Sequence, residues 1–250
     1  MSAVTDGSDR EASGPEGGAP AGYLSRTRSF TRRGGRMPPR HQQAYDQLAP
    51  RYVIDVPREG GSTTVAPAYC LDPAVAFGRV APLVVEVGPG SGDALIAGAR
   101  ARPDTDFLAL EVWRPGIGQC LSRMIEDPLP NVRFVEADAE VALATMLMPG
   151  SVEEVWTYFP DPWPKRKQQH RRIVGPEFAD TVRRVLRVGG LWRLATDIDG
   201  YATHMRKVLD AHEGFELVST ERAPLRPVTR FERKGAAVGR SITDLAYRRL

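Results

Sequence analysis

The sequence predicts an α/β fold built on a mainly parallel, doubly wound sheet. Between residues 83 and 249, short apolar runs of strand length alternate with amphipathic segments of helix length. Strands that alternate with helices in this way form parallel sheets through βαβ crossovers. The chain has 250 residues, of which 42% are hydrophobic, so it is long enough to bury one sizeable core.

The first three expected strands open this pattern. The run "LVVEV" at 83–87 is short and apolar, which is typical of a buried strand, and a glycine-rich loop follows it. A helix is then expected at 91–102, a second strand at 107–112, a helix at 114–127 and a third strand at 132–138.

The second half of the chain continues the alternation. A fourth strand is expected at 152–159, a helix ending in glycine at 176–190, a fifth strand at 191–197 and a helix at 200–212. The runs at 215–218 and 241–249 are expected to close the sheet, with an antiparallel final strand.

The expected strands share a polar feature, because each of the first five delivers a carboxylate at or near its carboxyl end. Ligands of open α/β sheets bind outside the carboxyl ends of the strands. One such acid would mean little, but five at the same edge predict a binding site there. The five acids are Glu86, Glu111, Asp138, Asp161 and Asp197.

The glycine loop after the first strand discriminates between cofactors. Gly88, Gly90 and Gly92 give the spacing G-x-G-x-G, and Asp93 stands where a dinucleotide fingerprint has its third glycine. Glu86 and Asp93 would repel a pyrophosphate but attract S-adenosylmethionine (SAM), which carries a sulfonium and an ammonium. Glu111, about twenty residues on, could bind ribose hydroxyls of either cofactor. The loop therefore favours SAM.

The N-terminal segments differ in composition from the rest of the chain. Residues 1–22 are rich in Gly, Ser, Pro, Ala and acids and are expected to be disordered. Residues 23–60 form a basic arm with six arginines between Arg26 and Arg40, and its first part is too rich in glycine and proline for a stable helix. Its charge and aromatics predict phosphate contact, and a solvated tail is the alternative. Residues 61–250 are expected to form the main domain.

Cysteines, histidines and apolar runs narrow the class of protein. Cys70 and Cys120 lack C-x-x-C spacing, so a reducing compartment is expected. The first 22 residues contain no apolar signal region, and no run approaches the length of a membrane helix. We therefore expect a cytoplasmic protein without membrane contact. The four histidines show no metal-ligand spacing, so no metal site is expected.

The stretch "YFPDPWPKRKQQHRR" at 158–172 places an acid and an aromatic residue among three prolines. Proline fixes φ, so the prolines are expected to hold Asp161 and Trp163 in one rigid turn. Asp161 could accept hydrogen bonds from a ligand at the mouth of the site. Trp163 either stacks on a base or is a structural residue.

A basic cluster follows this turn directly. It could follow a phosphate backbone, and a solvated face is the alternative reading. Its members are Lys165, Arg166, Lys167, Arg171 and Arg172.

Five blocks of sequence together resemble the bacterial tRNA (guanine-N7)-methyltransferases. They are "VVEVGPGSGDAL", "DFLALEVWRPGIGQCL", "YFPDPWPKRKQQHRRIV", "LATDIDGYATHM" and "RPVTRFERKGAAVGRSITDLAYRR", and they span about residues 84–249. The resemblance implies a Rossmann-like class I methyltransferase fold and methyl transfer from SAM to N7 of guanosine 46 in the tRNA variable loop. Pro164 and the tract "KQQHRR" depart from some relatives, but neither removes a residue with an expected role.

The resemblance also implies roles for individual residues. Asp161 is expected to be catalytic and to touch the cofactor as well. The remaining cofactor residues would be Glu86, Gly88, Gly90, Gly92, Glu111 and Asp138. The substrate residues would be Lys165, Asp197, Thr229, Arg230, Phe231 and Glu232, although the residues alone suggest only a loop at 228–232. The expected partner is tRNA, and the protein would be a monomer or homodimer.

Three other classes of function are alternatives to tRNA guanine-N7 methylation. A methyltransferase acting on an exocyclic amine would have an Asp/Asn-Pro-Pro-aromatic corner, whereas this chain reads Asp-Pro-Trp-Pro. A nucleotide-binding oxidoreductase is opposed by Asp93 and by the basic arm. A non-catalytic RNA-binding module is opposed by the carboxylates at five strand ends.

Overall fold

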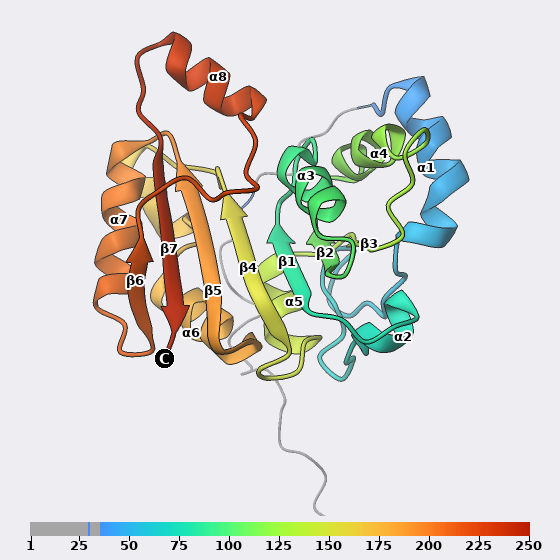
Figure 1. Ribbon diagram of the computed structural model, residues 1–250, viewed down its shortest axis with the longest axis horizontal. Helices are drawn as coiled ribbons and strands as arrows, with labels where there is room; N and C mark the ends of the chain where they lie inside the picture. The colour runs from blue at the N-terminus through green and yellow to red at the C-terminus, as the bar shows by residue number, and fades with distance from the viewer. Residues whose placement is uncertain (1–29, 31–35) are drawn as a thin grey trace, which may run out of the picture.

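The computed structural model describes residue 30 and residues 36–250, and within the second range the side chains of Arg230, Phe231 and Lys234 lie outside the description. The expected tail at 1–22 and residues 23–29 and 31–35 of the basic arm therefore lie outside the described residues. The described chain forms a seven-stranded sheet with the order β3-β2-β1-β4-β5-β7-β6 (Figure 1). All pairs among the first five strands are parallel, and β7 is antiparallel to both β5 and β6. The predicted fold class is confirmed.

The strands lie close to where the sequence pattern predicts them. Their bounds are β1 Leu83–Val87, β2 Asp106–Leu110, β3 Val132–Val135, β4 Val152–Tyr158, β5 Leu186–Thr196, β6 Phe215–Ser219 and β7 Thr243–Arg249. The helices are α1 Pro39–Tyr52, α2 Pro73–Phe77, α3 Asp93–Ala101, α4 Arg114–Arg123, α5 Ala139–Thr145, α6 Pro176–Val185, α7 Asp199–Asp210 and α8 Arg230–Ala237, with a 3₁₀ helix η2 at Arg166–Arg171.

The core has two halves, one on each face of the sheet. Successive side chains of a strand point to opposite faces, so Val84 and Val85 belong to different halves. The half that contains Val85 includes Phe178 of α6. The half that contains Val84 includes Leu95 of α3 and Ile117 of α4. Because both faces are covered, β1 is buried along its whole length, as a central parallel strand requires.

The helix expected at 176–190 is shorter than predicted. It ends at Val185, and the next eleven residues form β5. Gly189 has a φ of 77°, and the pairing of β4 with β5 shifts its register between Val152 and Glu154. The two glycines of "LRVGG" therefore belong to an irregular stretch within the strand and do not end the helix.

Two segments expected to lack helix contain one. The helix α1 begins at Pro39, in the part of the arm that was predicted to contain too much proline for a helix. Proline is compatible with this position because the first residue of a helix needs no backbone N–H. The expected loop at 228–232 contains the start of α8. Thr229 caps α8 by accepting a hydrogen bond from the backbone N–H of Glu232 at 3.2 Å. The spelling T-x-x-E is a capping box, which is the signal that predicts this helix.

Candidate active site

The central strands bring the predicted cofactor residues together. In β1, Glu86 pairs with Ala109 of β2 on one side and with Trp156 of β4 on the other. The glycine loop follows β1, and Glu111 follows β2 by one residue. The carboxyl ends of three adjacent parallel strands therefore meet at the glycine loop, as the sequence predicts.

The three loop glycines serve two different purposes. All have left-handed backbones, with φ of 66° at Gly88, 57° at Gly90 and 74° at Gly92. A Cβ atom at Gly88 or Gly90 would meet no atom of the described residues within 4 Å, so these residues leave space beside the loop there. A Cβ atom at Gly92 would lie 2.6 Å from the Sγ atom of Cys120. The first two glycines leave room for a ligand, whereas Gly92 allows α4 to pack closely.

Glu111 is held in place by the backbone around it. Its Oε1 atom accepts a hydrogen bond from the N–H of Trp113 at 2.9 Å, and its Oε2 atom accepts one from Gly90 at 3.3 Å. Each carboxylate oxygen can accept more than one hydrogen bond. A buried, oriented carboxylate beside the glycine loop is suited to bind the hydroxyls of a ribose.

Glu86 is buried at the centre of this region. Its side chain is only 3% exposed, and its Oε2 atom has no hydrogen-bond partner among the described residues. Burial, with the negative charges of Asp93 and Glu111 as further causes, raises the pKa of Glu86 to about 8. An unpartnered carboxyl oxygen among acids is costly unless a cation joins it. The donor set therefore fits a cationic cofactor such as SAM.

Asp138, which lies between β3 and α5, has a structural role. It caps α5 by accepting a hydrogen bond from the N–H of Glu140 at 3.1 Å, and its own N–H donates to the carbonyl of Thr63 at 2.8 Å. The sequence interpretation of Asp138 as a cofactor ligand did not include this cap. The cap fixes the carboxylate at the same sheet edge.

The proline-rich turn after β4 is strained. The strand ends at Tyr158, and the following Phe159 has a φ of 51° while Trp163 has a φ of 41°. Aromatic residues adopt positive φ only where surrounding contacts hold them, and such strain is typical of functional sites. The N–H of Phe159 donates to the carbonyl of Ala195 at 2.8 Å, which ties the turn to β5. Asp161 lies half-buried between the two strained residues.

Arg172 does not belong to the exposed basic cluster, so the prediction that it contacts phosphate is wrong. It is only 8% exposed. It donates to the carbonyls of Pro162 at 3.0 Å and Gly200 at 3.1 Å, and its guanidinium lies 4.8 Å from the ring centroid of Tyr201. Arg172 therefore holds the proline-rich turn against α7. Its spacing in the sequence gave no sign of this burial.

Arg171 and Trp163 form a stacked pair at the same turn. The guanidinium carbon of Arg171 lies 3.7 Å from the ring centroid of Trp163, which is a close cation–π contact. Arg171 also donates to the carbonyl of Phe30 at 3.0 Å, so one residue of the basic arm lies beside the turn. Lys165, with Arg166 and Lys167, remains exposed.

The predicted substrate residues near α8 have partners within the protein. Asp197 accepts a hydrogen bond from Arg240 at 2.8 Å. Thr229 caps α8, and Glu232 is buried in ion pairs with Arg222 and Arg226. Arg230 and Phe231 lie in α8, but their side chains are outside the described part of the chain. In Figure 1, α8 lies at the top of the view, beyond the ends toward which β1 and β4 point.

Arg226 and Asp244 belong to this ion-pair cluster, and sequence reasoning missed both. Arg226 precedes the "TRFE" tract, and Asp244 lies in β7, eighteen residues away. Nothing in the spacing of these two residues predicts a buried pair, because their contact depends on the path of the intervening chain, which includes α8.

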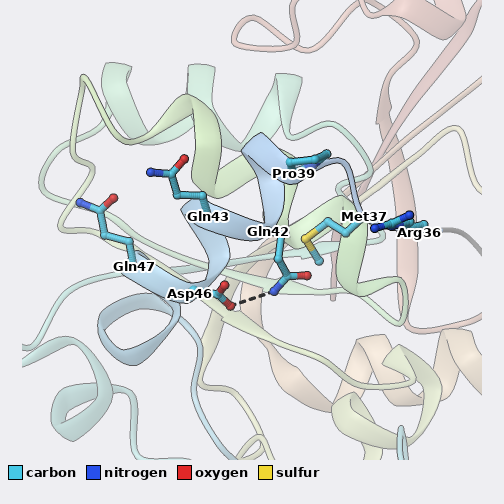
Figure 2. Close-up of a pocket in the computed structure, with 7 residues that line it drawn as sticks. All are labelled: Arg36, Met37, Pro39, Gln42, Gln43, Asp46 and Gln47. Atoms are coloured by element: carbon cyan, nitrogen blue, oxygen red, sulfur yellow. Dashed lines mark hydrogen bonds between the residues drawn. The ribbon is translucent and has the colours of Figure 1, made fainter.

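A separate hollow runs along the exposed face of α1 (Figure 2). Its volume is about 710 Å³. Within it, Gln42 donates to Asp46 at 2.8 Å. None of the residues predicted to bind cofactor lines this hollow, so it is distinct from the site at the sheet edge. Its lining residues are Arg36, Met37, Pro39, Gln42, Gln43, Asp46 and Gln47.

Among the residues that the structure describes, no helix is both long and apolar enough to cross a lipid bilayer.

Solved structures with a similar fold are methyltransferases. The 16S rRNA methyltransferase KamB aligns with a TM-score of 0.51 and 17% identity over 70% of this chain and 91% of its own. A mutant 16S rRNA (adenine(1408)-N(1))-methyltransferase from Catenulisporales acidiphilia, solved with cosubstrate SAM, aligns with a TM-score of 0.51 and 18% identity over 72% of this chain and 92% of its own. At these identities the likeness concerns the fold alone.

Sequence comparison is more specific. Residues 80–245 match a family model described as "Putative methyltransferase". Curated relatives named tRNA (guanine-N(7)-)-methyltransferase include proteins from Cutibacterium acnes (46% identity, 89% of this chain and 83% of the relative), Nocardioides sp. (48%, 88% and 86%) and Saccharophagus degradans (41%, 89% and 95%). The chain belongs to the tRNA (guanine-N(7)-)-methyltransferase family.

Proposed function

We propose that this protein transfers the methyl group of SAM to N7 of guanosine 46 in the variable loop of tRNA. The observation that carries the proposal is the buried Glu86 carboxyl, whose Oε2 atom lacks a hydrogen-bond partner among the described residues, in the strand next to the one that leads into Asp161. A site suited to a cation would then lie beside the proposed guanine site. The names of the relatives support tRNA as the substrate.

The residues around the glycine loop would hold the cofactor. Glu86 would meet a cationic group, Glu111 would accept hydrogen bonds from the ribose, and Asp138 would lie at the same edge. Open space beside Gly88 and Gly90 lets a ligand approach the backbone closely. When bound, SAM supplies a methyl group on a positively charged sulfur.

The reaction requires alignment more than proton transfer. Guanine N7 has a lone pair and no proton, so no general base is needed. An in-line displacement gains most from holding the reacting atoms in position. Asp161 would accept hydrogen bonds from the N1–H and N2–H₂ edge of the base and lie within reach of the cofactor. Its carboxylate would also offset the positive charge that develops on the ring.

The exposed basic residues would bind the tRNA backbone. Lys165, Arg166 and Lys167 follow the catalytic turn directly and are exposed. The hydrogen bond from Arg171 to the carbonyl of Phe30 places this one residue of the basic arm near the turn. Arg36 and Arg40 lie at the start of α1. Phosphate contacts from both segments would orient the variable loop toward Asp161.

Nucleoside mass spectrometry tests the proposed function. Incubation with tRNA and isotope-labelled SAM should yield labelled 7-methylguanosine, and a tRNA with adenosine at position 46 should yield none. Label in N2-methylguanosine, in an amino acid or in no nucleoside would overturn the proposal.

A further inference from the structure

Arg226 is a buried cation that the proposed methyl transfer does not use. Its side chain has no exposed surface. Its Nε and Nη2 atoms donate to the two oxygens of Asp244 at 2.8 and 2.7 Å, and its Nη1 atom donates to Glu232 at 2.6 Å. Two carboxylates therefore fix the orientation of the guanidinium, and the flexible ammonium of a lysine cannot copy this forked geometry.

Arg226 lies against the start of the proline-rich turn. Asp244 pairs with Ala195 of β5, and Ala195 pairs with Tyr158 at the end of β4. The guanidinium carbon lies 5.3 Å from the ring centroid of Phe159 and 5.9 Å from that of Tyr158. Phe159 is one of the two strained aromatic residues, so Arg226 is one of the contacts around a backbone conformation that its neighbours must hold.

The same cation holds the N-terminal end of α8. Glu232 lies in the first turn of this helix, which Thr229 caps. Farther along α8, a Cβ atom at Gly235 would lie 3.2 Å from the Oδ2 atom of Asp197, so the helix backbone closely approaches the end of β5. Arg226 thus joins the turn that carries the catalytic residue to the helix that covers Asp197.

We propose that Arg226 is a positioning residue, which fixes the proline-rich turn and α8 relative to each other so that both meet the same substrate. The inference rests on the proposed function. Buried ion pairs contribute little net stability compared with well-packed apolar residues. A role in geometry therefore accounts better for the buried Arg226–Glu232–Asp244 cluster than a role in stability does.

Two substitutions test this role in single-turnover methylation with saturating SAM and tRNA. Arg226→Met keeps an unbranched, flexible side chain and removes the charged guanidinium, and we expect the rate to fall about 10- to 100-fold, as for slight misplacement of reacting groups. Arg226→Lys should recover only part of the rate because it lacks the fork. The dissociation constant of SAM should change less than about twofold in both variants, since the carboxylates that Arg226 binds, Glu232 and Asp244, are not predicted cofactor residues.

Arg248→Met is the matched control. Arg248 lies in β7, the strand that contains Asp244, and forms an exposed ion pair with Glu216 at 2.8 Å. The rate of this variant should equal that of the wild type.

A double-mutant cycle separates positioning from general stability. If Arg226 acts through the turn that carries Asp161, Arg226→Met should cost much less rate in an Asp161→Asn background. Equal costs in both backgrounds, or a normal rate for Arg226→Met alone, would overturn the inference. If Arg226→Met does not fold, Asp244→Asn enters the same cycle with the same two outcomes. Absence of 7-methylguanosine with the wild-type protein would instead refute the proposed function.

Discussion

Two regions at the edge of the sheet differ in how completely their polar groups are paired. We call the region around the glycine loop the cofactor side, and the region around Asp197 and α8 the substrate side. Around the glycine loop, the Oε2 atom of Glu86 lacks a partner among the described residues and open space adjoins Gly88. On the substrate side, Asp197 binds Arg240 and Glu232 binds Arg226. We propose that the first side receives a small cation. The second is organised by its own ion pairs, and a large substrate must fit that arrangement or displace part of it.

The largest expected effect comes from the residue where the two sides meet. Asp161→Asn keeps the shape of the side chain but removes its charge. The single-turnover rate of tRNA methylation should fall by roughly 2–4 kcal/mol of barrier, as for the loss of one preorganised electrostatic group. The affinity for SAM and the melting temperature should change little. Lost stability with a normal rate would show that Asp161 is only a structural residue.

Glu86 gives the next largest effect, and it concerns the cofactor side alone. Glu86→Gln removes the charge that would meet the SAM cation, so SAM should bind more weakly by roughly 1.5–3 kcal/mol, which is typical of a hydrogen bond to a charged group. Calorimetry measures this directly. Glu153→Gln, which alters an exposed ion pair with Arg187, is the matched control and should bind SAM normally.

The raised pKa of Glu86 also makes a prediction about pH. The folded protein keeps this proton up to a pKa of about 8, whereas the unfolded chain loses it near 4.5. Between these values the unfolded state binds fewer protons, so the free energy of unfolding should decrease as pH rises from 4.5 toward 8. Glu86→Gln should remove this slope. SAM binding to the wild type near pH 7 should release protons, detectable as binding enthalpies that depend on the buffer, and proton uptake would contradict the assignment.

The smallest effects are expected from the basic residues after the turn. Replacing Lys165, Arg166 and Lys167 with alanine should flatten the dependence of log affinity for tRNA on log salt by roughly 0.7–0.9 per lost phosphate contact. Arg172→Ala should instead lower the melting temperature, because Arg172 is buried against Pro162 and Gly200. Filter binding across a salt series measures the salt dependence of the affinity for tRNA. If the triple variant has the same salt dependence as the wild type, Lys165, Arg166 and Lys167 do not contact phosphate.

The cofactor side could be predicted from sequence because its residues follow local rules. The glycine loop directly follows a strand, and an acid about twenty residues later follows the neighbouring strand. The fold therefore brings Gly88, Gly90 and Glu111 together at one sheet edge. The substrate side depends on long-range contacts. Arg226 binds Asp244 of β7, eighteen residues farther along the chain, and Arg172 is buried against Gly200 of α7. Periodicity and charge along the chain carry no information about either contact.

In the proposed reaction, the lone pair of guanine N7 attacks the methyl group of SAM while Asp161 holds the opposite edge of the base. A tRNA with 7-deazaguanosine at position 46 tests it most directly. This analogue replaces N7 with a carbon and keeps the N1–H and N2–H₂ edge. This tRNA should bind with normal affinity and accept no methyl group in a single-turnover assay. Methyl transfer to the analogue at position 46 would contradict it.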